Sequence, residues 1–514
     1  MGDPAAQPVR PAPARPVALP AGGDGGQRPL AAEQLGGPGG PRGARRPRPR
    51  PARDLRSRPQ RGGPVSGPTR ARRTRPRSPG RPGAGPDARG TEIEVEVGPV
   101  AHGGHCVARH EGRVVFVRHA LPGERVVARI TEGAAEAKFW RADAVRVLRA
   151  DPARVEPACP VARPGMCGGC DFQHATGAKQ RELKAQVVAE QLHRLAGLDL
   201  DVVVEEAPSA GPEGLRWRTR TQFAVDAEGR TGLRGHRSHD VVPLEDCPIS
   251  TERVVGSGVL AQRFGNVETV EVAAGSDGAP PLVVVTPTPG RHAHLPRLPD
   301  ASVAVRTADG LHRVSGRTWV EERVTVRGED HAFRVGGAGF WQVHPAAPTL
   351  LGEAVLAALD PRPGESALDL YSGAGLFTAL LADAVGAGGS VLAVEGEERA
   401  VRDARRSLHG REQVELWAGA VEEALVDEEL TARRVDVVVL DPPRSGAGRE
   451  AVAAVAALGA RAVAYVACDP AALARDTASL AEHGYVLAGL RAFDLFPQTH
   501  HVECVARFVP RAQG

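Results

Sequence analysis

The sequence predicts an α/β protein whose C-terminal part is a doubly wound, Rossmann-like domain, preceded by a small OB-like β-barrel and a mixed α+β section. Two observations predict the Rossmann-like part. From Gly339 onward, short apolar runs alternate with stretches of helical spacing, and runs such as 437–440 are apolar at every position. Such continuous runs are typical of strands buried on both faces of a parallel sheet. A third observation predicts the barrel, because residues 91–97 alternate strictly between polar and apolar side chains, as a half-buried strand does.

The chain divides into segments of opposite charge. Residues 1–90 hold 19 arginines, no lysine and five acidic residues, a net charge of +14, and contain no Phe, Tyr or Trp. The remaining residues carry −11, so the overall net charge of +3 conceals the difference. Because residues 1–90 cannot bury enough apolar surface to offset chain entropy, we expect a disordered tail. Its arginines favour contact with RNA phosphates, but we interpret the tail as a solvated extension without a specific role.

Composition also predicts the compartment. The 514 residues contain no run of about 18 apolar residues, which predicts no transmembrane helix. The N-terminus has no apolar stretch behind its charges, so we expect no secretory signal and a cytoplasmic protein. In that setting an odd count of seven cysteines suits metal ligation or catalysis better than disulfides.

The barrel is predicted over residues 91–150 and the mixed section over residues 151–335. Barrel strands are expected at 91–97, 113–117, 124–130 and 142–147. Small barrels of this kind are a frequent scaffold for nucleic acids. In the mixed section we expect a helix at 178–195 and strands at 217–225, 303–306 and 323–326. The pattern of the mixed section predicts no topology.

The Rossmann-like domain is predicted over residues 336–514. Its strands are expected at 366–371, 390–395, 414–417, 435–441, 462–468, 485–490 and 502–509. Helical stretches separate most of them, as in a parallel sheet covered on both faces. The last two strands lie too close together for an intervening helix and should pair antiparallel. Ligands of such a sheet bind at the carboxyl ends of its strands.

A glycine turn follows the first of these strands. Residues 368–375 read Leu-Asp-Leu-Tyr-Ser-Gly-Ala-Gly, and Glu395 ends the next strand 20 residues later. The glycines allow close approach of a ligand, and an acidic residue at that distance can hold ribose hydroxyls. NAD is the competing ligand, but Thr378 stands where its third glycine would be. Residues 441–444, Asp-Pro-Pro-Arg, favour S-adenosylmethionine, because such D-P-P elements are familiar from methyltransferases acting on nucleobases and similar compounds.

A lone cysteine follows the fifth strand. Asp469 suits a helix N-cap and Pro470 the first helical position, with the helix continuing over 471–482. The Cys468 thiol would then face the positive end of the helix dipole, which favours the thiolate, its nucleophilic form. Glu503, 35 residues further on, is a candidate proton acceptor. A small cysteine buried at a strand end is the alternative, and this stretch alone does not decide between them.

Four other cysteines form a candidate metal site. Cys159, Cys167 and Cys170 follow the spacing C-x7-C-x2-C, and Cys247 lies further along in Glu-Asp-Cys-Pro. Four thiolates are what an iron–sulfur cluster or a structural zinc requires, and the spacing leaves these two almost equal. Two unrelated buried pairs are the third alternative. The remaining cysteines, Cys106 and Cys504, are expected to be buried without a functional role.

With these elements in order, the chain resembles the RNA uracil-5-methyltransferases, the family of the 23S rRNA and tRNA m5U enzymes, over residues 91–514. The resemblance is carried by Phe340-Trp341-Gln342-Val343, the turn at 369–375, Asp441 to Arg444, Cys468-Asp469-Pro470, Leu473-Ala474-Arg475-Asp476 and His501-Val502-Glu503. The family usually has Ser and Asn where this chain has Ala467 and Asp469.

The resemblance implies a mechanism and its residues. It implies Cys468 as nucleophile and Glu503 as base, and S-adenosylmethionine held by Gln342, Tyr371, Glu395 and Asp441. It also implies a TRAM-type RNA-binding barrel and a 4Fe-4S cluster on Cys159, Cys167, Cys170 and Cys247, because Gly168-Gly169-Cys170 followed by Gln173-His174 is similar to the cluster-bearing members. We expect a monomer acting on a loop of structured RNA, 23S rRNA before tRNA.

Two rivals stay open at this point. One is a methyltransferase that uses the D-P-P element on an amino group, which would need no thiolate and so leaves Cys468 and Glu503 unexplained. The other is a non-catalytic RNA-binding iron–sulfur protein that retains the fold, against which the presence of both residues argues.

Overall fold

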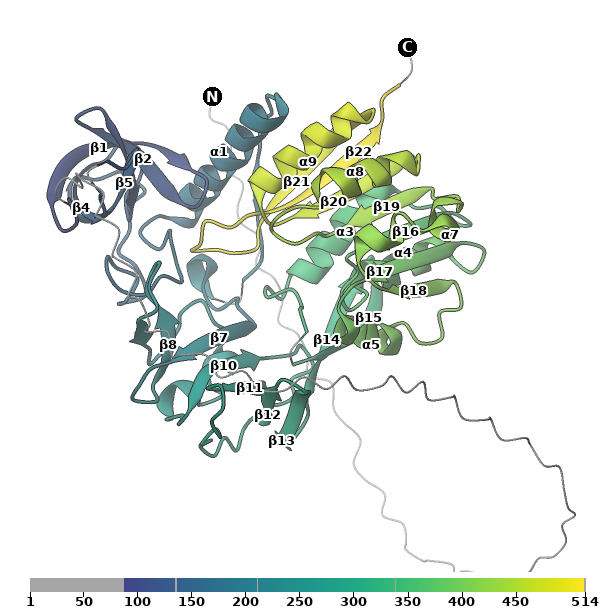
Figure 1. Ribbon diagram of the computed structural model, residues 1–514, viewed down its shortest axis with the longest axis horizontal. Helices are drawn as coiled ribbons and strands as arrows, with labels where there is room; N and C mark the ends of the chain where they lie inside the picture. Colours follow the sequence, from purple (N-terminus) through teal and green to yellow (C-terminus); the bar gives the residue numbers. More distant parts are fainter. Residues whose placement is uncertain (1–86, 135, 210, 338, 513–514) are drawn as a thin grey trace, which may run out of the picture. The chain divides into compact units, whose positions relative to one another are not determined.

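The computed structural model describes residues 87–134, 136–209, 211–337 and 339–512 (Figure 1). The prediction of a disordered tail over residues 1–90 falls, but for its last four residues, outside the described residues. No helix within the described residues is long and apolar enough to cross a membrane.

The N-terminal described segment is a closed five-stranded barrel in the order β1-β2-β3-β5-β4. Its strands are β1 (Glu92–Ala101), β2 (His105–His110), β3 (Arg113–Arg118), β4 (Arg125–Glu132) and β5 (Phe139–Arg149). The alternation in β1 buries Ile93, Val95 and Val97 inside the barrel and leaves the acidic residues between them exposed. The predicted barrel is therefore confirmed, with β2 added to the four expected strands.

The middle section is built around a seven-stranded sheet in the order β13-β12-β11-β10-β7-β8-β9. Its elements are α1 (Gly177–Ala196), β6 (Val204–Glu206), η1 (Pro212–Gly214), β7 (Arg220–Val225), β8 (Thr231–Arg234), β9 (Val241–Pro243), α2 (Glu252–Val255), η2 (Val259–Ala261), β10 (Val267–Ala273), β11 (Leu282–Pro287), β12 (Ser302–Thr307) and β13 (Gly310–Ser315). The hairpin of β14 (Trp319–Val326) and β15 (Glu329–Gly336) follows. Short strand β6 does not join this sheet and instead pairs parallel with β21, at the edge of the C-terminal sheet.

The C-terminal sheet has eight strands in the order β18-β17-β16-β19-β20-β22-β21-β6. Its elements are α3 (Ala347–Leu359), β16 (Ser366–Leu370), α4 (Leu376–Val385), β17 (Ser390–Glu395), α5 (Glu398–Ser407), β18 (Val414–Ala418), α6 (Val421–Ala424), α7 (Glu428–Thr431), β19 (Val437–Leu440), α8 (Gly448–Ala457), β20 (Ala462–Ala467), α9 (Pro470–Glu482), β21 (Tyr485–Asp494) and β22 (Glu503–Pro510). Strands β16, β17, β18, β19 and β20 pair parallel. The last two strands, β21 and β22, pair antiparallel as predicted, and β22 is also antiparallel to β20.

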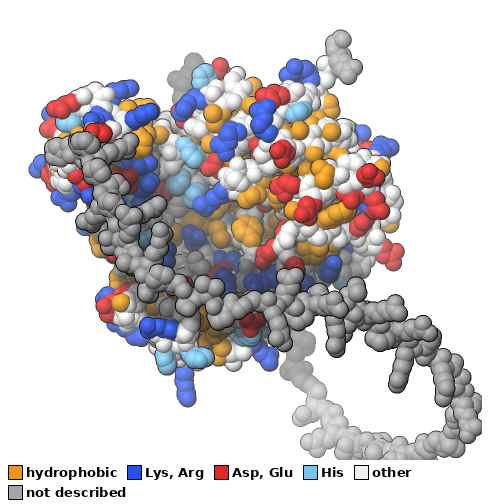
Figure 2. Space-filling model, viewed as in Figure 1, with side chains coloured by type: hydrophobic (Ala, Val, Ile, Leu, Met, Phe, Trp, Pro, Cys, Tyr) orange, Lys and Arg blue, Asp and Glu red, His pale blue; other side chains and the backbone are white. Residues whose placement is uncertain are grey.

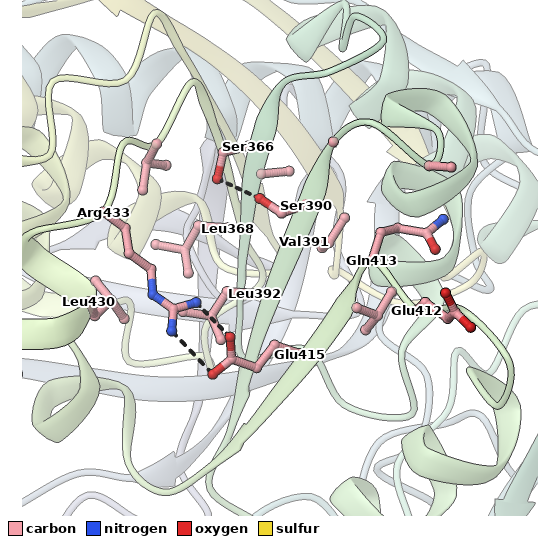
Figure 3. Close-up of a pocket in the computed structure, with 15 residues that line it drawn as sticks. Ser366, Leu368, Ser390, Val391, Leu392, Glu412, Gln413, Glu415, Leu430 and Arg433 are labelled. Atoms are coloured by element: carbon pink, nitrogen blue, oxygen red, sulfur yellow. Dashed lines mark hydrogen bonds and ion pairs between the residues drawn. The ribbon is translucent and has the colours of Figure 1, made fainter.

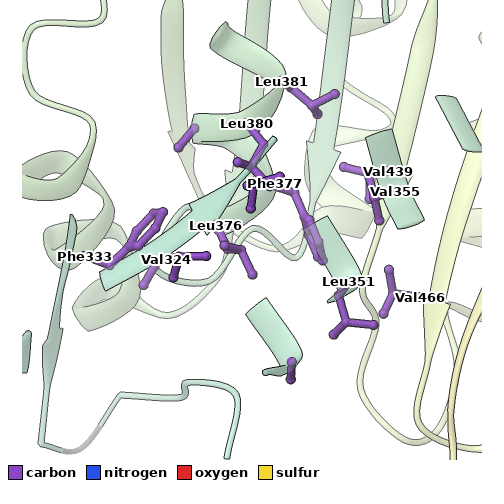
Figure 4. Close-up of a cluster of buried hydrophobic side chains, with 14 of the residues drawn as sticks. Val324, Phe333, Leu351, Val355, Leu376, Phe377, Leu380, Leu381, Val439 and Val466 are labelled. Carbon is purple, nitrogen blue, oxygen red and sulfur yellow. The ribbon is translucent and has the colours of Figure 1, made fainter. Parts of the chain in front are cut away.

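Both faces of this sheet are buried, which explains its continuous apolar strands. Val437 and Val439 face a cluster made with α3 and α4, part of which is drawn in Figure 4. Val438 and Leu440 face the opposite cluster, made with α8 and α9. The chain order reverses between β16 and β19, since β17 and β18 lie on one side of β16 and the later strands on the other. A crevice for ligands is expected at the carboxyl ends beside such a reversal.

Candidate functional site

Strand register brings Cys468 and Glu503 together. Ala467, the last residue of β20, is the antiparallel partner of Cys504 in β22. Cys468 follows Ala467 and Glu503 precedes Cys504, so the thiol and the carboxyl lie opposite each other at the carboxyl edge of the sheet. Glu503 is 4% exposed, and its charge acts on the thiol. The pairing of β20 with β22 thus brings together Cys468 and Glu503, which lie 35 positions apart in the sequence.

A second carboxyl group belongs to the same cluster. Asp441 follows β19, the strand next to β20 in the sheet. Burial raises the pKa of Asp441 to about 7, and burial together with repulsion from Asp441 raises the pKa of Glu503 well above its usual range. The exposed Arg444 opposes the shift at Glu503. Two buried carboxyl groups that repel each other cannot easily both ionise, so the pair holds a proton near neutral pH.

The Cys468 thiol sits in an environment opposite to the one expected. Burial raises its pKa to about 12, and the charges of Glu503 and Asp441 add to the effect. The expectation that the helix dipole favours the thiolate is therefore wrong for the resting protein. The helix itself begins as predicted, with the Asp469 side chain accepting a hydrogen bond from Ala472 N at 2.8 Å. The dipole is outweighed by the low polarity around the sulfur and by nearby negative charge, so attack by Cys468 requires a base to take its proton.

The glycine turn and Glu395 form one hydrogen-bonded unit. The Glu395 carboxylate accepts hydrogen bonds from Gly373 N at 2.8 Å and from Glu397 N at 2.7 Å. Each carboxylate oxygen has a further lone pair, so Glu395 can still accept bonds from a hydroxyl-bearing ligand. Tyr371, in the turn, has a φ of 63°, a left-handed conformation that is uncommon for a residue other than glycine. Strained backbone of this kind clusters at ligand sites, so the turn has the features of one.

A buried pair that the sequence analysis did not predict, Asp369 and Thr378, supports the glycine turn. Asp369 is fully buried in β16, and its carboxylate accepts a hydrogen bond of 2.5 Å from Thr378 Oγ1 in α4. Burial raises the pKa of Asp369 to about 7. The pair ties the strand to the helix across the glycine turn, which accounts for threonine at the position where a dinucleotide site has glycine. The available signal was an acidic residue inside an otherwise apolar strand.

The structure does not group Gln342 with the other predicted cofactor residues. Gln342 precedes α3 and lines a cavity of about 620 Å³ together with Thr219, Glu322 and Trp341. Tyr371, Glu395 and Asp441, all within the described residues, do not line that cavity. The role of Gln342 therefore stays a prediction from the resemblance.

The four predicted ligand cysteines meet in one small cavity. Cys159, Cys167, Cys170 and Cys247 line it together with Gln173, Asp246 and apolar side chains. The first three come from one loop segment and Cys247 from a loop after β9, so the fold recruits a residue distant in sequence. Gly169 N donates to Cys167 Sγ at 3.4 Å, and Gln173 Nε2 donates to Cys170 Sγ at 3.2 Å. Four thiols with N–H donors pointing at sulfur form a donor set suited to a metal centre.

Two further features of the described residues carry no site. A cavity of about 500 Å³, drawn in Figure 3, lies at the amino ends of β16 and β17, where Arg433 and Glu415 form an ion pair of 2.6 Å. That is the edge of the sheet opposite Cys468. Elsewhere, ligand atoms of Glu329, His331 and Asp383 lie within 4.8 Å of one another. Arg411 donates to both oxygens of Asp383, and a guanidinium cation there opposes a metal cation.

Comparison with known proteins agrees with these features. A TRAM domain matches residues 86–145 and the tRNA (uracil-5-)-methyltransferase domain matches residues 419–509. An uncharacterized RNA methyltransferase of Streptomyces avermitilis is 50% identical over 83% of this chain and all of its own length. The 23S rRNA (uracil(1939)-C(5))-methyltransferase of Alkalilimnicola ehrlichii is 35% identical over 82% of this chain and 97% of its own length.

A solved structure has the same fold. The tRNA (uracil-54, C5)-methyltransferase of Pyrococcus abyssi, in complex with S-adenosyl-L-homocysteine, matches 81% of this chain and all of that chain, with a TM-score of 0.60 and 22% sequence identity. The doubly wound sheet, the preceding TRAM barrel and the relatives named as RNA methyltransferases identify an RNA methyltransferase. The chain belongs to the RNA uracil-5-methyltransferase family, because the family's domain matches and because the chain aligns with nearly the whole length of its relatives.

Proposed function

We propose that this protein methylates carbon 5 of a uridine in structured RNA, with Cys468 as the nucleophile and Glu503 as the base. The observation that carries the proposal is the register of β20 and β22, which opposes the thiol and the carboxyl at the ligand-binding edge of the sheet. A nucleophile next to a titratable base is the arrangement that covalent catalysis on a uracil ring needs.

The chemistry follows from the electronic properties of uracil. Carbon 5 is a poor nucleophile, so the Cys468 sulfur first adds to carbon 6 and converts the ring to an enolate that is nucleophilic at carbon 5. S-adenosylmethionine, when bound, supplies an electrophilic methyl group at that carbon. Glu503 then takes the proton from carbon 5, the carbon–sulfur bond breaks, and the thiolate leaves.

The carboxyl pair accounts for the proton transfers. Because the resting thiol is protonated, its proton must leave as sulfur attacks. The ionised member of the Asp441–Glu503 pair accepts this proton and passes it to solvent, so that Glu503 is ionised again when the carbon-5 proton leaves. Raised pKa values suit this role, since a base works best when its pKa lies close to the working pH. Asp441 then contributes both to the charge of the pair and to the predicted cofactor site.

Glu395 and the glycine turn are proposed to bind the ribose of the cofactor. Glu395 is fixed by two backbone N–H groups and keeps lone pairs for ribose hydroxyls. The neighbouring Tyr371 packs partly against the apolar cluster beneath the turn. These contacts support Glu395 as a cofactor residue, and Tyr371, Asp441 and Gln342 are proposed from the resemblance.

We further propose that the cysteine cavity holds a 4Fe-4S cluster, which supplies a rigid, fourfold-tethered anchor rather than a step of methyl transfer. The similarity of Gly168-Gly169-Cys170 and Gln173-His174 to the cluster-bearing members favours a cluster over zinc. Four cysteines that line one cavity argue against unrelated pairs.

The proposed substrate is a loop of 23S rRNA, with tRNA as the alternative. Relatives of about 35% identity act on 23S rRNA, whereas the matched domain and the solved structure carry tRNA in their names. Mapping of 5-methyluridine in rRNA and tRNA from cells with and without this protein tests both. We expect a single 23S uridine to lose its methyl group; loss in tRNA would assign the alternative, and no loss in either RNA would contradict the proposed function.

A further inference from the structure

A turn of the barrel reaches the nucleophile. The turn between β1 and β2 carries His102, whose Nε2 lies 2.9 Å from Asp469 Oδ2, next to Cys468. Figure 2 shows histidine side chains, in pale blue, between the barrel and the catalytic sheet. His102 and Gly104 line a cavity there together with Cys468, Asp469 and His500.

The same turn also packs against the segment before Glu503. A Cβ on Gly104 would lie 2.7 Å from the Cβ of His500, so a side chain at that position would collide. Gly104 also has a φ of 76°, which favours glycine. The barrel turn therefore contacts both loops that carry the proposed catalytic pair, the one at Cys468 through His102 and the one before Glu503 through Gly104.

Asp469 divides its carboxylate between two partners. Oδ1 accepts from Ala472 N and caps α9, whereas Oδ2 faces His102 from the barrel. Its charge also contributes to the raised pKa of the Cys468 thiol, together with Glu503 and Asp441 and against Arg444. A cation hydrogen-bonded to Asp469 offsets that contribution. The hydrogen bond to Asp469 raises the pKa of His102, assisted by Glu190 of α1 and opposed by burial and by Arg475 of α9.

We propose that His102 is a positioning residue for the proposed nucleophile: it holds the Asp469 carboxylate from the barrel and thereby keeps the Cys468 loop in place and screens the thiol from the charge of Asp469. This inference rests on the proposed role of Cys468. It makes the RNA-binding barrel part of the catalytic apparatus, because displacement of the barrel turn would withdraw the cation from Asp469.

Stability is a poor readout for this pair. The side chains of His102 and Asp469 are 39% and 24% exposed, and partly exposed ion pairs contribute little to the free energy of unfolding. The reactivity of the neighbouring thiol is the sensitive quantity, since nucleophilicity depends on the thiolate fraction. The test therefore follows alkylation of Cys468 by iodoacetamide in the full chain, quantified on the Cys468 peptide by mass spectrometry between pH 6 and pH 9.

The variants are His102→Ala, His102→Gln, Asp469→Asn and the double variant His102→Ala with Asp469→Asn. We expect His102→Ala to slow alkylation at pH 7 roughly fivefold and His102→Gln, which keeps a donor without the charge, to fall in between. Asp469→Asn keeps an oxygen for the helix cap and removes the negative charge, so alkylation should be at least as fast as in the wild type. In that background His102→Ala should have no further effect. His110→Ala, a barrel histidine that lies against Trp140, is the matched control and should behave as the wild type.

Methylation assays complete the test. We expect His102→Ala to lower kcat with little change in the KM for RNA. Unchanged alkylation of Cys468 in His102→Ala would overturn the proposal. So would a loss of alkylation rate from His102→Ala that is equally large in the Asp469→Asn background. A raised KM for RNA with unchanged kcat would also overturn it, because His102 would then be an RNA contact. The proposed function fails separately, because only methylation by Cys468→Ala at the wild-type rate would remove the nucleophile, whatever the alkylation rates show.

Discussion

Cysteine side chains have different surroundings at the carboxyl edge of the C-terminal sheet, where Cys468 lies, and in the cysteine cavity. In both places burial raises the pKa of the thiol, that of Cys468 to about 12 and that of Cys167 to about 11. The neighbours differ. Cys468 faces the carboxyl groups of Glu503 and Asp441, whereas the cavity cysteines face one another and N–H donors such as Gly169 N.

This difference shows that neighbours, rather than burial, decide what a buried thiol can do. Carboxyl groups offer the Cys468 proton an acceptor, so a thiolate can form for the length of a reaction and be protonated again. At the cysteine cavity the lining carboxylate, Asp246, accepts two hydrogen bonds from Arg216 and is held as an ion pair. Four thiolates there need a permanent positive charge, which a metal centre provides. One site is therefore suited to proton transfer and the other to ligation.

Removal of the reactive thiol should have the largest effect. Cys468→Ala is expected to lower RNA methylation more than about a thousandfold, because nothing else in the cluster can add to carbon 6. Binding of S-adenosylmethionine should be unchanged, since the thiol acts only on the base. The measurement is transfer of labelled methyl groups to RNA, with Cys106→Ala, which removes a buried barrel thiol, as control. Wild-type turnover by Cys468→Ala would show that methylation does not proceed through a covalent adduct of Cys468.

Removal of the acceptor alone should stop the reaction later. In Glu503→Gln, Asp441 can still accept the thiol proton, so the sulfur adds and methyl transfer proceeds, but the carbon-5 proton stays and elimination stalls. We expect multiple turnover to be lost and a protein–RNA adduct that survives denaturing electrophoresis. The double variant with Cys468→Ala should give no adduct, which identifies the attached residue. Normal turnover by Glu503→Gln would show that the base lies elsewhere.

The cysteine cavity is best tested through its most distant ligand. Anaerobically purified protein should be brown and contain about four irons per chain. Cys247→Ser should lose this iron and lower stability, because the loop that carries Cys247 is otherwise tied to the Cys159–Cys170 segment only by packing. Cys106→Ser is the matched control and should keep its iron. An intact cluster in Cys247→Ser would exclude this residue as a ligand. One zinc per chain without iron in the wild-type protein would show that the site is a structural zinc site.

The two regions also differ in how far the sequence predicts them. Local signals make Cys468 and Glu503 candidates, the resemblance implies their roles, and the ladder at Ala467 and Cys504 places the two residues opposite each other. The spacing of the cysteines predicts ligation, but no local pattern orders the surrounding seven-stranded sheet, whose β11–β12 pair is parallel among antiparallel neighbours. The pKa of Cys468 was missed because burial and the charges of Glu503 and Asp441 arise only in the folded sheet, and the contact of His102 because it joins residues 367 positions apart.

The cofactor site should respond moderately to loss of one carboxylate. Glu395→Ala is expected to raise the dissociation constant of S-adenosylmethionine about tenfold to a hundredfold, the range of one or two charge-assisted hydrogen bonds. Isothermal titration calorimetry measures it. Glu397→Ala is the matched control, because this exposed neighbour donates only its backbone N–H to Glu395. An unchanged constant in Glu395→Ala, or tight binding of NAD by the wild type, would contradict the cofactor assignment.

The smallest expected effect is a shift in pH dependence that tests whether the carboxyl pair distinguishes the catalytic thiol from the cavity thiols. Glu503 and Asp441 have raised pKa values and act as bases only when ionised, so single-turnover methylation should rise with pH through about 7 and fall on the acid side. Asp441→Asn removes the like charge that helps raise the pKa of Glu503, and the acid limb should move to lower pH by about one unit. The lowered negative charge also eases ionisation of Cys468, which shifts the limb in the same direction. Saturating S-adenosylmethionine separates this effect from weaker cofactor binding. If the pH at which the methylation rate falls on the acid side is the same in Asp441→Asn as in the wild type, the two carboxyl groups do not share a proton. The base would then act on Cys468 independently of Asp441.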